Sequence, residues 1–413
     1  MVSDAGTDIG REDPLTGEPP RGPATGAPGE ELAGLRLPDA VREALLGPLI
    51  DHHCHGVRRD DLGRARFELL VTEAGTPAPP GTTHFDTPAG AALRRWCAPV
   101  LGLEPHAQPA VYLSRRAELG AEEVNRRLLR RAGIRTFLVD TGIGSGPEYL
   151  GPDEMGLLGG GTAREIVRLE RVERDVAADV ASAVHYASRL SEELDRRAEG
   201  AVALKTIIAY RCGLDFDPEP PSRGELLAAA ARRVADPKAR LSDPVLLRNL
   251  LWTGVDVARE RGLPLQFHTG YGDADLDLDR CDPARMSGFL RRAQPSGVPI
   301  VLLHCYPFHR SAAYLAAVFP QVYADLGLSL TYTAAGSAAV VAETLELVPW
   351  HKLLFSSDCY GLAEFAHLGA LYYRRGLGRA LESRLAEGEL SVADAARVAH
   401  ITGSGNARRL YRL

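Results

Sequence analysis

Residues 48–56, PLIDHHCHG, hold three of the chain's twelve histidines, directly after a short apolar run. Side chains of an extended strand alternate between two faces, so His53 and His55 share one face with Asp51. Two imidazoles on one face at the end of a strand can bind a single metal ion together. A solvated polar turn after a strand would use the same residue types, so this stretch alone leaves both interpretations open.

The composition is that of a soluble globular protein and argues against several classes of partner. The 413 residues are 45% hydrophobic and 25% charged, with a formal net charge of -6. Without a basic excess, the attraction that dominates nucleic-acid binding is missing, and no apolar run reaches the about 18 to 20 residues that span a bilayer. Six dispersed cysteines without a CxxC pair suit a reducing compartment, and the N-terminus shows no signal pattern, so we expect a cytoplasmic protein. Because nucleic acid and membranes are disfavoured as partners, we expect a small-molecule substrate.

Eight short apolar or β-branched runs recur along the chain, separated by stretches with helical periodicity such as residues 174–200. Strand followed by helix, repeated eight times, predicts a (β/α)8 TIM barrel, an α/β fold. The third run fits the start of the following helix equally well. The eight runs are residues 48–56, 134–142, 164–172, 201–210, 263–270, 298–306, 321–328 and 351–361.

The remaining segments predict a tail and an insertion around one barrel domain, residues 36–413. Residues 1–35 are rich in Gly, Pro, Asp and Glu without apolar periodicity, so we expect a disordered N-terminal tail. Residues 57–130 are too long for a barrel loop and carry their own helical patterns. We expect them to form a helical insertion after the first strand, acting as a lid over the barrel mouth.

Chemistry in such barrels sits at the carboxyl ends of the strands, so the residues that end each run are the informative ones. Several runs end in metal-ligand residue types, and burying that many polar groups at one rim is costly without a partner. This convergence predicts a metal site rather than core packing. The residues are His53 and His55 on the first run, Lys205 on the fourth, His268 on the fifth, His304 on the sixth and Asp358 on the eighth.

An HxH pair on the first strand, His on the fifth and sixth, and Asp on the eighth resemble the amidohydrolase superfamily of metal-dependent barrel hydrolases. The segments LKTIIAYRCGL, LPLQFHTGYGDADLDL, LLFSSDCYGLAEFAHLGALYYRR and ITGSGNARRLY are closest to the amidohydrolase-like domain that some proteins carry fused to a glutamine-synthetase domain. The resemblance covers roughly residues 40–413, with its specific motifs mainly after residue 200. No glutamine-synthetase part follows here, so we expect a stand-alone version.

The resemblance implies a divalent metal held by His53, His55, His268 and Asp358, with zinc favoured and manganese or iron as alternatives. It also implies that Asp358 takes a proton from a metal-activated water and passes it to the leaving group. His304 would polarise the substrate carbonyl or serve as a further metal ligand. Lys205 would be carbamylated and bridge two ions, or would bind a substrate carboxylate or pair with Asp358; we favour one ion.

Candidate substrate-binding groups follow the fourth, fifth and sixth runs. An arginine at a barrel mouth is suited to bind a carboxylate through two hydrogen bonds, although a structural ion pair is an equal alternative for this one. The loop after the sixth run is expected to be long and polar, so its histidine fits a solvated surface position as well. The candidates are Tyr210, Arg211, Tyr271, Asp273 and His309.

These observations lead to a primary functional hypothesis and two alternatives. The first is a metal-dependent amidohydrolase that cleaves a C–N bond of a small, carboxylate-bearing amide such as a glutamyl-type amide. The second keeps the same site for a metal-dependent decarboxylation, and the third is a non-catalytic barrel that serves as a binding module. The intact ligand set argues against the third. We expect a homodimer, which is compatible with all three hypotheses.

Overall fold

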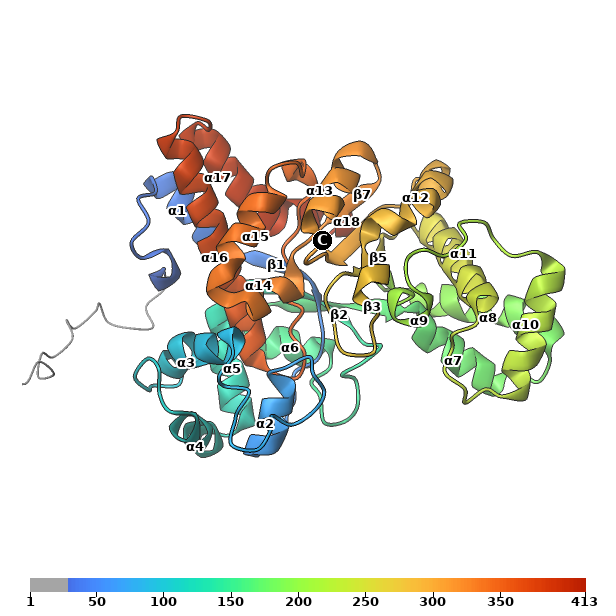
Figure 1. Cartoon of the computed structure of the whole chain (residues 1–413), viewed down its shortest axis with the longest axis horizontal. Helices are drawn as coiled ribbons and strands as arrows, with labels where there is room; N and C mark the ends of the chain where they lie inside the picture. Colours follow the sequence, from blue (N-terminus) through green and yellow to red (C-terminus); the bar gives the residue numbers. More distant parts are fainter. Residues whose placement is uncertain (1–28) are drawn as a thin grey trace, which may run out of the picture.

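The computed structural model describes residues 29–413, and a curved parallel sheet forms its centre (Figure 1). The strands follow one another in chain order around the sheet, and each pairs in parallel with the next. The strands are β1 (Leu49–Cys54), β2 (Ile134–Asp140), β3 (Thr162–Arg168), β4 (Ala203–Thr206), β5 (Leu265–Thr269), β6 (Ile300–His304) and β7 (Val322–Ala324).

The eighth predicted strand is an extended segment that closes the barrel without forming a regular strand. The Leu354 amide donates to the carbonyl of Ala324 on β7 at 3.0 Å, and the amide of His52 on β1 donates to the Phe355 carbonyl at 3.2 Å. Hydrogen bonding to β1 continues past Asp358, although its φ of 50° lies in the left-handed region: the Asp358 amide donates to the His53 carbonyl at 3.1 Å, and the His55 amide donates to the Cys359 carbonyl at 2.8 Å. The prediction of a TIM-barrel α/β fold is confirmed, with its last strand irregular.

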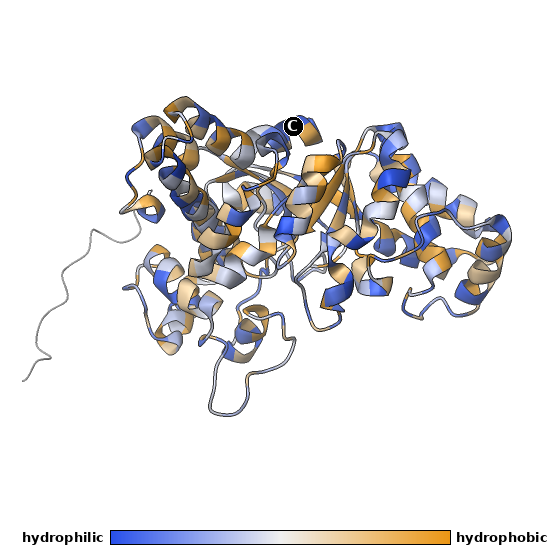
Figure 2. Cartoon of the chain, turned by 45° about the horizontal axis from the view of Figure 1, so that its top comes forward, coloured by the Kyte–Doolittle hydropathy of each residue, from blue (hydrophilic) through white to orange (hydrophobic). Residues whose placement is uncertain are grey.

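Helices surround the sheet, and the hydrophobic residues lie between them and the strands (Figure 2). The predicted helical stretch 174–200 forms two helices, because the chain leaves the helix after Asp179 and Ser182 caps a new one. The helices after β3 are α7 (Leu169–Asp179), α8 (Ala183–Ala198), α9 (Ala209–Cys212), α10 (Arg223–Ala235), α11 (Pro244–Arg261), α12 (Ser287–Ala293), α13 (His309–Val318), α14 (Gly327–Thr333), α15 (Ser337–Thr344), α16 (Ala363–Ala386), α17 (Val392–His400) and α18 (Asn406–Tyr411). None of the described helices is both long and apolar enough to cross a bilayer.

The segment between β1 and β2 is helical, as its sequence pattern predicts. Its helices are α2 (Arg64–Leu70), α3 (Pro88–Val100), α4 (Pro109–Leu119) and α5 (Ala121–Ala132). Helices α3 and α5 pack against α16, which follows the closing segment of the barrel. The loop after α2 turns inward and lines a cavity at the barrel mouth, so this segment contributes directly to the candidate site.

The predicted tail is ordered over its last residues. Residues 1–28 lie outside the described part, but Glu30–Leu32 form a short 3-10 helix against α16, followed by α1 (Asp39–Leu46). Leu32 is fully buried, and the Arg375 guanidinium of α16 donates to the Glu31 carbonyl at 2.9 Å. Residues 29–35 of the expected tail are therefore held against α16 by apolar burial and by hydrogen bonding.

The barrel interior has its own apolar cluster at the end opposite to the histidines. Ile50, Leu138 and Val301 from the strands meet Leu410 and Tyr411 of α18 there. Helix α18 therefore plugs this end of the barrel, and its last side chain lies beneath the candidate site.

Candidate active site

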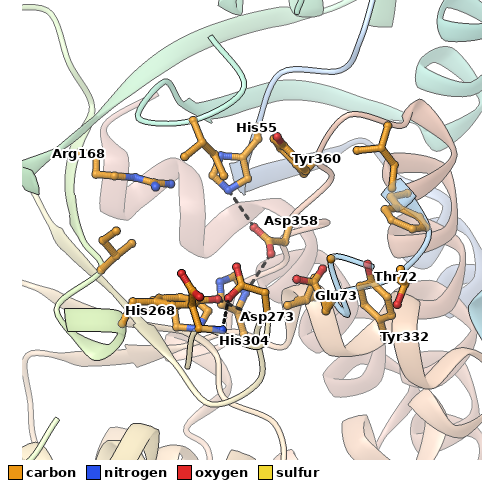
Figure 3. Close-up of a pocket in the computed structure, with 18 of the residues that line it drawn as sticks. His55, Thr72, Glu73, Arg168, His268, Asp273, His304, Tyr332, Asp358 and Tyr360 are labelled. Carbon is orange, nitrogen blue, oxygen red and sulfur yellow. Dashed lines mark hydrogen bonds and ion pairs between the residues drawn. The ribbon is translucent and has the colours of Figure 1, made fainter. Parts of the chain in front are cut away.

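A cavity of about 450 Å³ lies at the carboxyl ends of the strands, and the predicted site residues converge on it (Figure 3). Side chains of His55, His268, His304 and Asp358 line it, and His53 lies buried directly behind them. The side chain of Asp358 points towards His55 and His304 in the same view. The residues that the strand-end rule selected therefore lie close together in the structure.

His53 makes three polar contacts that fix its ring. Its Nδ1 lies 2.9 Å from Gln266 Oε1, and its Nε2 lies 2.8 Å from Lys205 Nζ and 3.2 Å from Asp358 Oδ1. An amide oxygen can only accept, so Nδ1 carries the proton and the Nε2 lone pair faces the site. Burial and the Lys205 charge lower the pKa of His53 to about 3, so the ring is neutral near pH 7.

His55 is held in the same tautomer by the backbone. Its Nδ1 donates to the Asp140 carbonyl oxygen at 3.1 Å, and its Nε2 lies 3.4 Å from Asp358 Oδ1. Both histidines of the HxH pair therefore direct Nε2 towards the same carboxylate and use Nδ1 for a second contact, an arrangement that is typical of metal-binding imidazoles.

Among the predicted metal-site residues, three buried polar atoms have no hydrogen-bond partner within residues 29–413: His268 Nε2, His304 Nδ1 and Asp358 Oδ1. Nitrogen and oxygen atoms also form two compact groups within 4.8 Å, His53 with His55 and Asp140, and His53 with His304 and Asp358. Buried polar atoms without partners are costly, and a mixed imidazole and carboxylate set suits zinc, manganese or iron. The donor set therefore fits a divalent metal ion, although His268 lies outside both compact groups.

Two of these side chains are carried by unusual backbone. His304 has φ of 68° and Asp358 has φ of 50°, a region that non-glycine residues seldom adopt. The Asp325 carboxylate accepts the His304 amide at 2.6 Å, and the Asp358 amide donates to the His53 carbonyl at 3.1 Å. Such local strain is typical of residues whose side chains must be aimed at a site.

A buried hydrogen-bond chain beneath the site connects it to the C-terminal helix. The Gln266 amide nitrogen donates to the His52 carbonyl and to the Tyr411 hydroxyl, each at 2.9 Å, which leaves its oxygen for His53. The Tyr411 hydroxyl lies 2.9 Å from His52 Nδ1, and His52 Nε2 lies 2.8 Å from the Asp325 carboxylate. The Tyr411 hydroxyl accepts a hydrogen bond from the Gln266 amide nitrogen, so it helps to set the orientation of the Gln266 amide.

Tyr411→Phe is expected to weaken metal binding by about 10-fold, because Gln266 loses one of two acceptors that fix its amide and hence the His53 tautomer. Competition with a chromophoric chelator measures the affinity. Tyr323→Phe is the matched control, since Tyr323 packs on the same cluster without a hydroxyl partner among the described residues. Equal affinities for the two variants would show that the Tyr411 hydroxyl does not act on the site.

A buried group of charges at the carboxyl ends of β2, β3 and β4 flanks His53. Asp140 Oδ2 lies 3.2 Å from Lys205 Nζ and accepts from Arg168 Nε at 3.0 Å. Burial alone would raise the pKa of Asp140, but the two cations hold it well below its usual range. Asp140 and Arg168 are the last residues of β2 and β3. Asp140 also lies near the end of its predicted run, whereas the predicted third run extended to residue 172 and placed Arg168 in its middle.

Arg168→Met is expected to lower the free energy of unfolding by about 3 kcal/mol, because it removes one partner of a buried ion pair and leaves Asp140 short of compensating charge. Urea denaturation measures this loss. The control Arg197→Met removes a partly exposed arginine 3.8 Å from Asp175 and should cost below about 1 kcal/mol. Equal losses in both variants would contradict the assigned role of the buried pair.

The predicted substrate-binding residues divide between two cavities. Tyr210, Arg211 and Asp273 line the cavity of the candidate site. Tyr271 and His309 instead line a neighbouring cavity of about 650 Å³. His309 begins α13 and its Nε2 lies 2.7 Å from a Glu343 carboxylate oxygen, so the structure does not bring it to the metal-ligand cluster.

Close approach explains one glycine of the HTGYGD motif. A Cβ on Gly272 would lie 2.1 Å from the Tyr210 hydroxyl oxygen and 3.1 Å from His268 Nε2. The ring of Tyr210 packs on His268 with a centroid distance of 4.5 Å. Gly272 therefore lets the backbone pass beside both side chains.

Other cavity residues carry no local sequence signal. Glu73 and Thr72 come from the loop after α2, Tyr332 from α14, and Tyr360 from the segment after Asp358. Residues of the long insertion do not follow a predicted strand, so the strand-end rule could not predict that they line the cavity. The cysteines next to the ligand candidates are buried in the core: Cys54, Cys305 and Cys359.

A barrel with a buried cluster of neutral imidazoles and a carboxylate at the carboxyl ends of its strands has the architecture of a barrel metal-dependent hydrolase. The family model for amidohydrolases matches residues 174–413, more than half of the chain. The chain belongs to the amidohydrolase family, and the predicted resemblance is confirmed.

Individual proteins agree with this assignment. The chain is 32% identical to Protein fluG of Emericella nidulans over 223 aligned residues. The aligned region covers 51% of this chain and 26% of that protein, so the match spans about a quarter of the relative. A crystal structure from Lactobacillus casei ATCC 334, provisionally assigned as a metal-dependent hydrolase, shares 27% identity with a TM-score of 0.79 over 89% of this chain and 95% of that one. A uronate isomerase from Bacillus halodurans C-125 (14% identity, TM-score 0.63, 91% and 96% covered) shares the fold.

Proposed function

We propose that the protein hydrolyses a C–N bond of a small amide that bears a carboxylate, such as a glutamyl-type amide. The observation that carries the proposal is the cavity itself: the unpartnered atoms of Asp358 and His304 and the arginine Arg211 all belong to residues that line it. Membership of the amidohydrolase family and the likeness to the Lactobacillus casei structure support hydrolysis.

We assign His53, His55, His268 and Asp358 as ligands of one divalent ion, with zinc favoured. The neutral imidazoles and the unpartnered atoms of His268 and Asp358 support this set. Lys205 supports a single ion, because its ammonium group forms an ion pair with Asp140 at 3.2 Å. His304 stays free for substrate, although its place in a compact group with His53 and Asp358 makes it the alternative ligand.

The chemistry that such an ion supplies is acidification of a water molecule and polarisation of a carbonyl group. Asp358 is the proton carrier: although burial opposes this, the neighbouring His304, His53 and His55 hold its pKa well below the usual range, so it is ionised and can accept a proton from the water. It then delivers that proton to the leaving nitrogen. His304 Nδ1, 3.7 Å from Asp358 Oδ2, donates to the substrate carbonyl oxygen when it carries the proton.

The test is product analysis with a panel of ω-amides of dicarboxylic acids. Hydrolysis releases one amine or ammonia for each carboxylate formed, whereas the alternative, decarboxylation on the same site, releases carbon dioxide and leaves the amide intact. Purified wild-type protein is expected to release amine and no carbon dioxide. Carbon dioxide as the product, or binding without any product, would contradict the proposal and favour the decarboxylase or the binding module, respectively.

A further inference from the structure

The candidate-site cavity contains three charged side chains that form no salt bridge within the described part of the chain: the cation Arg211 and the carboxylates Glu73 and Asp273. The other arginines of the cavity are already paired, Arg168 with Asp140 and Arg240 with Asp275 at 3.1 Å. Arg211 and Glu73 line the same cavity of about 450 Å³, which a small ligand can occupy.

Glu73 is a carboxylate in an unfavourable setting. It lies in the loop after α2, and burial raises its pKa to about 7, with the charges of Asp358 and Asp273 adding to the effect and a hydrogen bond from Tyr332 opposing it. Figure 3 shows its carboxylate facing Asp358, on the side of the cavity away from Arg168. A positive group placed here would compensate three carboxylates at once, whereas an anionic or neutral group would compensate none.

Arg211 presents the opposite problem. Its Nε is buried without a hydrogen-bond partner among the described residues, and burial, together with the nearby Arg240 and Arg168 charges, lowers its pKa. A carboxylate is the group that a guanidinium binds through two hydrogen bonds. The cavity therefore has a cationic wall at Arg211 and an anionic wall at Glu73.

We propose that this cavity binds a zwitterion, with the ligand carboxylate at Arg211 and a ligand ammonium group at Glu73, so that the substrate class is an amino-acid amide. The inference rests on the proposed function for the position of the reacting amide, which lies beside Asp358. A dicarboxylic or purely aliphatic ligand leaves one of the two buried charges without a partner, which is costly.

The experiment is calorimetric binding to metal-loaded wild-type protein with three matched probes. L-glutamine carries both charges, glutaramate lacks only the ammonium group, and 4-aminobutanamide lacks only the carboxylate. Glutamine is expected to bind at least about 10-fold more tightly than either analogue, since each lost charge removes a charge-assisted hydrogen bond. No measurable binding of glutamine, or equal affinity for glutamine and glutaramate, would overturn the proposal.

Two variants assign the charges to their partners. Glu73→Gln, which keeps the shape and an acceptor for Tyr332, is expected to weaken glutamine and 4-aminobutanamide about 10-fold and to leave glutaramate unchanged. Arg211→Gln should weaken glutamine and glutaramate and leave 4-aminobutanamide unchanged. Equal effects on all three probes would overturn the assignment. If glutamine binds with the expected pattern but no amide of the panel is hydrolysed, the binding sites stand and the proposed hydrolysis fails.

Discussion

Asp358→Asn is expected to lower kcat by about 10³-fold while the protein stays folded. The carboxylate is the only acidic group with an unpartnered buried oxygen at the compact His53 and His304 cluster in the described structure, so no neighbour can replace it as proton carrier. The fold should tolerate the change because asparagine also adopts positive φ readily, and Asp358 has φ of 50°. Steady-state kinetics and thermal unfolding measure the two effects.

The control for this variant is Asp256→Asn, which removes an exposed carboxylate of α11 that pairs with Arg259 three residues on. It should retain full activity. Activity of Asp358→Asn within a few-fold of wild type would remove Asp358 from the mechanism.

His53→Ala is expected to abolish measurable turnover and to reduce the metal bound per chain well below that of the wild type. His53 belongs to both compact groups of donor atoms, so its loss breaks each of them. Truncation also leaves Gln266 Oε1 and Lys205 Nζ without the ring that they contact at 2.9 and 2.8 Å. Elemental analysis together with kinetics measures both consequences.

His185→Ala on the exposed surface of α8 serves as the matched histidine loss and should change neither quantity. Full metal occupancy in His53→Ala would show that the remaining residues hold the ion without this histidine, and the assigned ligand set would be wrong.

The sequence predicted the barrel and its rim because both depend on local pattern. Strand periodicity located the parallel runs, and reading the residue at each carboxyl end found His268, His304 and Asp358 on three different elements. The closing segment at Leu354 follows the same pattern, and it bonds to β7 and β1 without forming a regular strand.

What the sequence did not predict depends on contacts between distant segments. Glu73 reaches the cavity from an insertion with no strand end, and Tyr411 acts from the last helix through Gln266. His309 was expected at the mouth because it follows β6, but α13 starts at this residue and carries it towards Glu343. The spacing and composition of the sequence indicate none of these three positions.

The most direct test of the account is the metal content per chain, measured by elemental analysis of wild-type protein and Lys205→Ala purified without chelator. We expect one equivalent of a divalent metal in both, because Lys205 is assigned to an ion pair with Asp140 rather than to a bridge between ions. Circular dichroism of Lys205→Ala verifies that the barrel is intact. Two equivalents in the wild type that are lost in Lys205→Ala would establish a pair of ions bridged by this lysine. A folded wild-type protein that neither contains nor takes up metal would contradict the assignment of a metal-dependent hydrolase.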